Sequence, residues 1–392
     1  MIRNILVVAQ HESLIGGANK SLLDVIQHLI NHYSLKITVV VPKLGELSDE
    51  LKKRGIDFLV FSYSPSAYQI RHDIFDGWRI CKAAYKESLC KAEARKAAKA
   101  IKQMNQTFDL VYINDTNNIF GYYLSLALGI RYVWHFRNFQ TDIKRYVLFE
   151  KRIKNGTNGI HIAISHAMKS YMVHDRGIKP ELIYVVHNGV TNKNIFIKQP
   201  WHNNIDKRID IIHCGMLMEK KRQIDSIMAV GELVKMDYPV YLHLVGSSHI
   251  IHGKPYQDEL EQIVTSMELN DRVFFEGRLS DVANFRKDMH IELMCSKNEP
   301  FGRVTVEGMQ AGLVVIGYNG GATPEIIDDG KDGLLYNEDY HDLALKIKRV
   351  CDDLEYGDQL SRNALEKVKT HFTMEQNVKG IYRVMEEALR SH

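Results

Sequence analysis

The chain has 392 residues, of which 45% are hydrophobic and 25% are charged, and its formal net charge is +3. This length predicts about two domains, and this composition excludes collagen-like, disordered and low-complexity proteins. No apolar stretch reaches the roughly 20 residues of a membrane-spanning helix, and the first residues lack the pattern of a secretory signal. The five cysteines lack zinc-type spacing, as expected of reduced thiols. We therefore expect a globular cytoplasmic protein without a metal site.

Short apolar, β-branched segments alternate with longer helical patterns along the whole chain. In the first half the expected strands are residues 2–9, 36–41, 58–61, 110–113, 131–135, 160–164 and 182–186. In the second half they are residues 209–214, 240–245, 273–275, 291–294, 313–317 and 333–335. This alternation predicts parallel sheets built from strand–helix–strand units. Both halves are therefore expected to be doubly wound α/β domains.

A polar, asparagine-rich segment at residues 191–207 separates the two halves and predicts a linker. We expect an N-terminal domain of residues 1–195, a C-terminal domain of residues 207–372 and a final helix of residues 373–392. Apolar side chains recur at helical spacing in that last segment. We expect this helix to pack back across the domain junction.

The net charge of the whole chain is close to zero, but the first half of the chain has an excess of basic residues. Residues 1–200 contain 28 Lys and Arg against 16 Asp and Glu, whereas the remaining residues contain 23 against 32. Much of the excess lies between Arg79 and Lys102, where Glu87 and Glu93 are the opposing acids. A solvated helix packed on the sheet is the simpler interpretation; the alternative is a surface that meets anionic lipid headgroups or an anionic acceptor. The segment has no base-reading motif, so nucleic acid is not expected.

The segment 295–311, CSKNEPFGRVTVEGMQA, predicts a strand end, a loop and a helix that begins near Arg303. A helix that begins directly after a glycine presents backbone N–H donors and its positive dipole end, which favours a phosphate. Glu299 and Glu307 are anions and cannot hold that phosphate, but carboxylates beside it can accept hydrogen bonds from sugar hydroxyls. The alternative is that Glu307 faces solvent and Glu299 ends a strand.

A second strand–glycine–helix junction follows at once, after the strand at residues 313–317. Thr323 suits an N-cap, Pro324 the first helical position and Glu325 the first turn. We therefore expect two helix N-termini beside one crevice at the carboxyl ends of the strands.

The segment 299–335, EPFGRVTVEGMQAGLVVIGYNGGATPEIIDDGKDGLL, resembles the donor-binding signature of the retaining family-4 glycosyltransferases. Shorter similar segments occur in the family's order at residues 15–26, 133–136, 163–172, 185–190, 214–223 and 273–282. The resemblance implies the α/β GT-B fold, in which two doubly wound Rossmann-like domains face a central cleft.

The resemblance also implies roles for single residues. Glu307 would bind the nucleotide ribose and Glu299 the donor sugar. Lys221 would bind the diphosphate, but the arginine that usually accompanies it is Met216 here, so Arg222 or Arg303 is expected to replace it. The remaining donor-binding residues implied by the family pattern are Gly16, Gly17, Arg278, Phe301, Gly302, Arg303 and Val304.

The first half supplies the other expected site residues. His135 ends a strand and resembles the family histidine that lies near the transferred sugar; the alternative is a histidine satisfied by the backbone. Asn114 and Asp115 follow another strand and are candidates for the acceptor side. Thr191 replaces the aspartate that often follows the NGV motif, which we expect to affect only the local turn.

The resemblance implies the transfer of a sugar from a nucleoside diphosphate sugar to a hydroxyl with retention of the anomeric configuration, and we expect this transfer to need no metal ion. The chain contains no D-x-D motif and needs no cofactor besides the donor, for which uridine diphosphate is favoured over guanosine diphosphate. The acceptor would be a lipid-linked or otherwise anionic saccharide of surface polysaccharide or glycolipid assembly, met at the inner face of a membrane. Two alternatives remain: a nucleotide-sugar epimerase on the same fold, and a binding subunit without catalysis.

Overall fold

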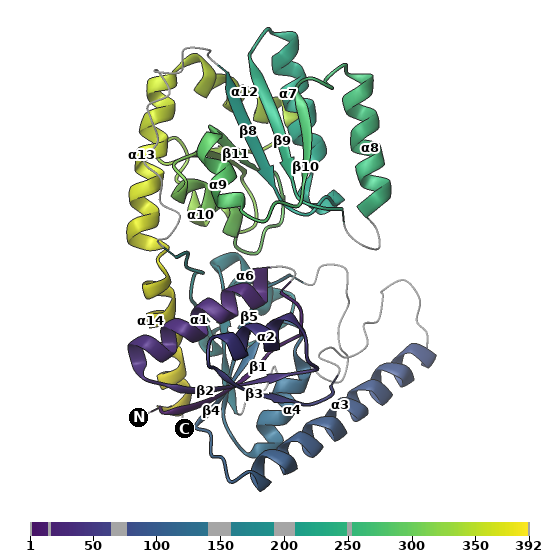
Figure 1. The fold of residues 1–392 in the computed structure, drawn as a ribbon, viewed down its shortest axis with the longest axis vertical. Coiled ribbons are helices and arrows are strands. Elements are labelled where there is room, and N and C mark those ends of the chain that lie inside the picture. Colours follow the sequence, from purple (N-terminus) through teal and green to yellow (C-terminus); the bar gives the residue numbers. More distant parts are fainter. Residues whose placement is uncertain are drawn as a thin grey trace. The chain divides into compact units, whose positions relative to one another are not determined.

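The computed structural model describes residues 2–14, 17–63, 77–139, 158–191, 208–248 and 253–390. The chain forms two compact units (Figure 1). The first unit contains residues 1–189 together with the C-terminal residues 374–392, and the second contains residues 190–373. Each unit is built around its own parallel sheet.

The first unit has a seven-stranded sheet with the order β3-β2-β1-β4-β5-β6-β7. All of its strand pairs are parallel. The strands are β1 (Asn4–Val8), β2 (Lys36–Val41), β3 (Asp57–Val60), β4 (Leu110–Asn114), β5 (Tyr132–Phe136), β6 (Gly159–Ala163) and β7 (Ile183–Val185). Most of their side chains are buried, because helices cover both faces of a parallel sheet.

The helices of the first unit are α1 (Gly17–Tyr33), α2 (Glu46–Lys53), α3 (Gly77–Gln103), α4 (Ile119–Leu128), α6 (His166–His174), the 3₁₀ helix η1 (Pro180–Leu182) and α14 (Met374–Arg390). α3 packs against α4, and α14 packs against α1, β5 and β6. Met374, Val378, Ile381 and Met385 of α14 are buried in the core of this unit. The apolar stripe of the last helix is thus covered by the first sheet and α1.

The second unit has a six-stranded parallel sheet with the order β10-β9-β8-β11-β12-β13. Its strands are β8 (Ile209–Cys214), β9 (Val240–Val245), β10 (Val273–Gly277), β11 (Ile291–Met294), β12 (Val314–Tyr318) and β13 (Leu334–Tyr336). Its helices are η4 (Glu219–Lys221), α7 (Gln223–Lys235), α8 (Gly253–Ser266), α9 (Val282–Phe285), η5 (Arg286–Asp288), α10 (Arg303–Gln310), α11 (Thr323–Ile326), α12 (Tyr340–Asp352) and α13 (Leu354–His371). The expected pair of doubly wound α/β sheets is confirmed.

Each sheet has a point at which the strand order reverses. In the first sheet this point lies between β1 and β4, and in the second it lies between β8 and β11. Open α/β sheets bind ligands beyond the carboxyl ends of the strands at such a point. The loops that follow β1, β4, β8 and β11 are therefore the segments in which functional side chains are expected.

The expectation that Thr323 is the N-cap of α11 is wrong by one residue. Ala322 already has a right-handed helical conformation and is the N-cap, so Thr323 is the first helical residue. The Thr323 hydroxyl is buried and has no hydrogen-bond partner among the described residues. α11 also ends after four residues, because Ile327 is extended. A single turn provides little helix dipole, so α10 is the stronger anion-binding helix start of the expected pair.

Candidate functional site

Lys221 and Glu299 lie in direct contact in the second unit. Lys221 ends the 3₁₀ helix η4 in the loop after β8, and Glu299 lies in the loop after β11. The Lys221 Nζ donates a hydrogen bond of 2.7 Å to Glu299 Oε2, with side chains 26% and 14% exposed. The strand reversal between β8 and β11 thus joins two expected catalytic residues that are 78 positions apart in the sequence.

The loops around this pair are fixed by backbone contacts. The Ser296 hydroxyl donates to the Lys220 carbonyl at 3.1 Å, which ties the loop after β11 to η4. The Ala322 N–H donates to the Glu299 carbonyl at 2.9 Å. Gly321 has a φ of 56°, and a Cβ atom there would lie 2.5 Å from both the backbone N and O of Glu299. Only glycine therefore allows the loop after β12 to support Glu299 so closely.

α10 begins immediately beyond this pair. Its N-cap, Gly302, has a left-handed backbone with a φ of 88°, and as a glycine it has no side chain with which to cap the helix. An uncapped N-terminus leaves backbone N–H donors for a ligand. Phe301 is buried and Val304 is partly exposed in the first turn. The structure thus brings a lysine, a glutamate and a helix N-terminus together at the carboxyl edge of the second sheet.

Glu307, one turn into α10, is held by two arginines. Its Oε1 accepts from Arg303 Nε at 2.8 Å, and its Oε2 accepts from Arg286 NH1 at 3.2 Å. Arg286 also makes two bonds to the fully buried Glu292, of 2.8 and 2.9 Å. Burial lowers the pKa of Arg286, but the charges of Glu292 and Glu307 outweigh it and raise the pKa overall. This network fixes the carboxylate of Glu307, which is 27% exposed.

Arg222 and Arg303 were expected to replace the arginine that is Met216 here, but each forms an ion pair with an acidic residue. Arg303 bonds Glu307, as described, and Arg222 bonds Asp225 with distances of 2.5 and 2.8 Å. Arg222 has a left-handed backbone, with a φ of 56°, between η4 and α7. The hydrogen bonds that Arg222 donates to the Asp225 carboxylate raise the pKa of Arg222. Met216 is 37% exposed in the loop after β8.

The structure also gives the positions of two further residues that were expected to bind the donor. Arg278 is exposed, directly after β10, at the edge strand of the second sheet. Gly17 belongs to the first unit and is the first residue of α1, the helix that follows β1. Gly16 lies outside the described residues.

A polar cluster that the sequence did not reveal lies at the carboxyl edge of the first sheet. Its centre is Arg137, which follows β5 and is 5% exposed. The guanidinium donates to Asn114 Oδ1 at 2.8 Å, to Asn188 Oδ1 at 2.9 Å and to Ser21 Oγ at 3.2 Å. Among the described residues, each hydrogen-bond partner of this buried cation is neutral. A buried arginine without a counter-charge is costly and marks a site suited to an anion.

His135 is part of the same cluster and is fully buried. Its Nδ1 lies 2.5 Å from the Tyr112 hydroxyl and 3.3 Å from Arg137 NH2. A guanidinium can only donate, so Nδ1 is the acceptor and the proton of the neutral ring lies on Nε2. Burial, followed by the charge of Arg137, holds the pKa of His135 well below its usual range. The Nε2–H is buried and has no partner among the described residues.

The side chains of Asn114 and Asp115 mainly make hydrogen bonds to other residues of the protein. Asn114 holds Arg137 through its Oδ1, while its Nδ2 is buried without a partner in the described part of the chain. Asp115 has a φ of 140°, and its carboxylate accepts from the Thr116 N–H at 2.6 Å and from Asn138 Nδ2 at 2.8 Å. A strained backbone of this kind costs about 1–3 kcal/mol. Asp115 therefore shapes the loop, whereas Asn114 keeps an unused amide NH₂ group and His135 keeps one unused N–H donor.

Comparison with known proteins identifies the chain. The family described as "Glycosyltransferase Family 4" matches residues 15–193, and "Glycosyl transferases group 1" matches residues 195–367. The chain belongs to the family-4 glycosyltransferases. Both the family and the GT-B fold predicted from the sequence are confirmed for this glycosyltransferase.

The curated relatives of the glycosyltransferase are distant. It is 28% identical to the N-acetyl-alpha-D-glucosaminyl L-malate synthase of Bacillus anthracis over 46% of each chain. It is 28% identical to the lipopolysaccharide core biosynthesis glycosyltransferase LpsD of Rhizobium meliloti, over 42% of this chain and 45% of the relative. The match therefore spans about half the length of these relatives.

Solved structures agree with the fold over the full length. A glycosyltransferase from Rickettsia africae has a TM-score of 0.78 at 17% identity and covers 100% of both chains. HepE from Anabaena in complex with UDP has a TM-score of 0.79 at 19% identity, over 98% of this chain and 100% of HepE.

No helix among the described residues is both long and apolar enough to cross a membrane.

Proposed function

We propose that this glycosyltransferase transfers a sugar from a nucleoside diphosphate sugar to a hydroxyl acceptor, with retention of anomeric configuration and without a metal ion. The observation that carries the proposal is the contact between Lys221 and Glu299 beside the N-terminus of α10, whose N-cap is the glycine Gly302. This arrangement offers a cation and backbone donors for a diphosphate, and a carboxylate for sugar hydroxyls.

Each group of the second unit then has a role in the transfer. Breaking the anomeric bond builds positive charge on the sugar ring and negative charge on the diphosphate. Lys221 and the N–H groups of α10 stabilise the departing diphosphate, because they are held in place before the reaction begins. Glu299 binds the sugar, and Glu307 binds the ribose with the oxygen orientation that Arg286 and Arg303 impose.

We propose that His135 acts as a neutral hydrogen-bond donor rather than as a base. Its Nδ1 is occupied by Tyr112 and Arg137, and its lowered pKa keeps it uncharged at neutral pH. The Nε2–H is then available to a sugar or acceptor oxygen. Asn114 Nδ2 and the buried charge of Arg137 would favour an anionic group on the same ligand.

Uridine diphosphate is the proposed nucleotide. HepE of Anabaena, which shares the fold, has been crystallised with UDP and with UDP-glucose. The proposed acceptor is a lipid-linked or otherwise anionic saccharide at the inner face of a membrane. The basic first half and the relatives named for lipopolysaccharide core biosynthesis support this acceptor class.

A binding subunit without catalysis is the second candidate. It is favoured by Met216 in place of the usual cation, and by the acids that neutralise Arg222 and Arg303. For a catalytic protein, Lys221 remains the cation of the donor site, and it too is paired with an acid, Glu299. An epimerase on the same fold would convert the donor without any acceptor.

A panel of UDP- and GDP-sugars separates these possibilities. Thermal stabilisation identifies the donor that binds, and release of the nucleoside diphosphate with and without an acceptor measures turnover. We expect stabilisation and slow hydrolysis with one UDP-sugar, unchanged by a chelator. Stabilisation without hydrolysis or transfer would favour the binding subunit, and interconversion of the sugar would favour the epimerase. Loss of turnover with the chelator would contradict the metal-independent mechanism.

A further inference from the structure

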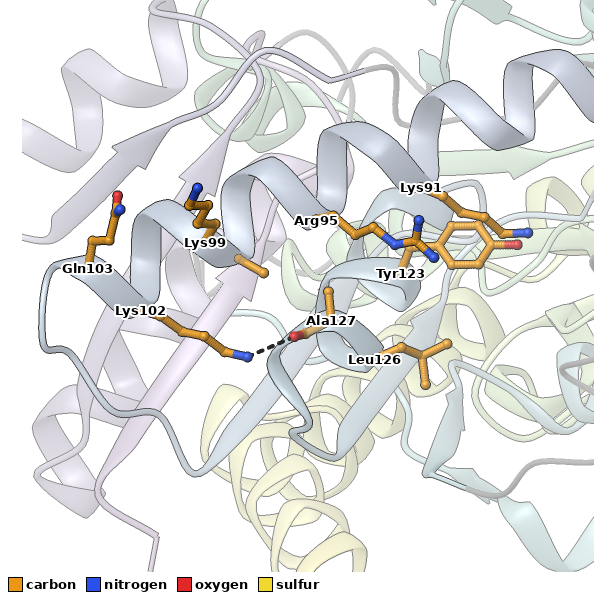
Figure 2. Close-up of a pocket in the computed structure, with 9 residues that line it drawn as sticks. Lys91, Arg95, Lys99, Lys102, Gln103, Tyr123, Leu126 and Ala127 are labelled. Atoms are coloured by element: carbon orange, nitrogen blue, oxygen red, sulfur yellow. Dashed lines mark hydrogen bonds between the residues drawn. The ribbon is translucent and has the colours of Figure 1, made fainter.

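A separate basic pocket lies on the first unit, between α3 and α4 (Figure 2). Its volume is about 790 Å³. Four cations from α3 line it together with apolar and aromatic side chains from α4: Lys91, Arg95, Lys99, Lys102, Tyr123 and Leu126. None of these residues takes part in the donor site or in the cluster around Arg137. The pocket therefore needs an explanation of its own.

The cations of the pocket are poorly balanced by acids. Figure 2 shows Lys91, Arg95 and Lys102 extending from α3 toward α4. Helix α4 carries no charged residue. Glu87 pairs with Lys91 at 3.4 Å and also accepts a hydrogen bond from Tyr123. Among the described residues, no acidic side chain pairs with Arg95 or Lys99. Such a cluster is stabilised by an anion that enters between the side chains.

Tyr85 and Leu89 are exposed on α3, N-terminal to these cations, and Leu126 is exposed among the pocket residues of α4. Tyr85 is 63% exposed and Leu89 is 43% exposed, one helical turn apart on α3, and Leu126 of α4 is 42% exposed. A small soluble anion would contact the cations and leave these groups in water. A lipid surface covers both kinds of side chain, as in interfacial helices that combine Lys and Arg with exposed aromatic residues and Leu.

From these two observations we propose that the pocket binds the phosphate headgroup of an anionic phospholipid and so docks the first unit on a membrane. The phosphate lies beside Arg95 and Lys102, which extend toward α4 and of which Lys102 also donates to the Ala127 carbonyl at 3.1 Å. Lys99 adds positive charge to the lining, and Tyr85 and Leu89 enter the interfacial layer. The inference deepens the membrane location proposed above and rests on it for its biological setting. Docking itself needs neither donor nor acceptor.

Flotation of the full chain with vesicles tests the proposal. The vesicles contain phosphatidylcholine alone or phosphatidylcholine with phosphatidylglycerol. The pocket variant is R95Q/K99Q, and the matched control is K52Q/K53Q, which removes the same charge from exposed positions of α2 in the same unit. Each basic residue near an anionic surface changes the partition about fivefold. We therefore expect about a 25-fold loss for the pocket variant and less than a twofold loss for the control.

Two further measurements separate lipid binding from other causes. Y85S/L89S should weaken vesicle binding without changing any affinity for inorganic phosphate, and donor binding by R95Q/K99Q should equal that of the unchanged chain. Equal losses in the pocket and control variants, or equal binding to neutral vesicles, would overturn the proposal. Saturable phosphate binding at Arg95 and Lys99 without vesicle binding would also overturn it, in favour of a soluble anion. A failure of donor binding in the unchanged chain would count against the proposed function alone.

Discussion

The ion pair that supports Glu307 predicts a large loss of stability when its cation is removed. Arg286 is 3% exposed, Glu292 is fully buried, and two hydrogen bonds of 2.8 and 2.9 Å join them. In Arg286→Met the carboxylate of Glu292 stays buried without a counter-charge. Removing one partner of a buried pair costs about 3–5 kcal/mol, so we expect the free energy of unfolding to fall by about this amount.

A double variant and a surface control make the test specific. Arg286→Met with Glu292→Met removes both charges, and apolar replacement of a buried pair is often neutral or stabilising. We therefore expect the double variant to recover most of the loss. Arg303→Met also removes a hydrogen bond to Glu307, but Arg303 is 34% exposed, so its cost should stay within about 1 kcal/mol. Urea titration followed by circular dichroism measures all three variants.

The loss of stability in Arg286→Met should depend on pH, and its direction can be predicted. A buried carboxyl without a counter-charge binds its proton more tightly than an exposed one. In Arg286→Met the penalty should therefore shrink as the pH falls toward 4, because the folded state gains from protonating Glu292. The reasoning is refuted if the single variant loses less than about 1 kcal/mol at pH 7, or if acid leaves the penalty unchanged.

Three further changes have defined outcomes. His135→Gln keeps a donor near Nε2 and should retain more transfer rate than His135→Ala; a limb near pH 6.5 in the rate profile that disappears in His135→Gln would contradict a neutral ring. Burial lowers the pKa of His161 to about 3, so below pH 6.5 the unfolded chain gains a proton there and stability falls by up to about 1.4 kcal/mol per pH unit from this residue. The buried His135 and His213 also have lowered pKa values and add to the slope, so urea titrations across this range should show that His161→Leu makes the slope shallower by about one proton, whereas the exposed His174→Leu leaves it unchanged. Gly321→Ala should destabilise the second unit and raise the donor KM more than Gly330→Ala, which has a similar positive φ but no contact closer than 3.5 Å; equal effects in thermal unfolding and kinetics would show that the contact with Glu299 is unimportant.

The sheets could be predicted because their strands are buried on both faces. Segments such as KITVVV and LVYIN are continuous apolar runs, and parallel strands covered by helices have this pattern. The N-cap expected at Thr323 is instead Ala322, because the backbone of Ala322 is already helical after the left-handed Gly321. Cap preferences describe a local tendency, and here the packing of Gly321 on Glu299 decides the geometry.

The pairing of side chains was harder to predict than their presence. Lys221 and Glu299 were both expected at the site, but their direct contact depends on which strands are neighbours. Arg286 was missed, although a glutamate inside the apolar strand IELM signals a buried charge that needs a partner. Arg137 was also missed; its signal was a cation two residues after His135, beyond a fully buried strand.

Binding of UDP by isothermal titration calorimetry tests the central claim most directly, namely that Lys221 and the start of α10 hold the donor diphosphate. The comparison uses the unchanged chain, Lys221→Ala and Lys220→Ala, a neighbouring exposed lysine of η4. A hydrogen bond to a charged group contributes about 1.5–3 kcal/mol, so Lys221→Ala should weaken binding at least tenfold while Lys220→Ala binds as the unchanged chain does. Equal affinity for UDP in all three proteins would contradict the account.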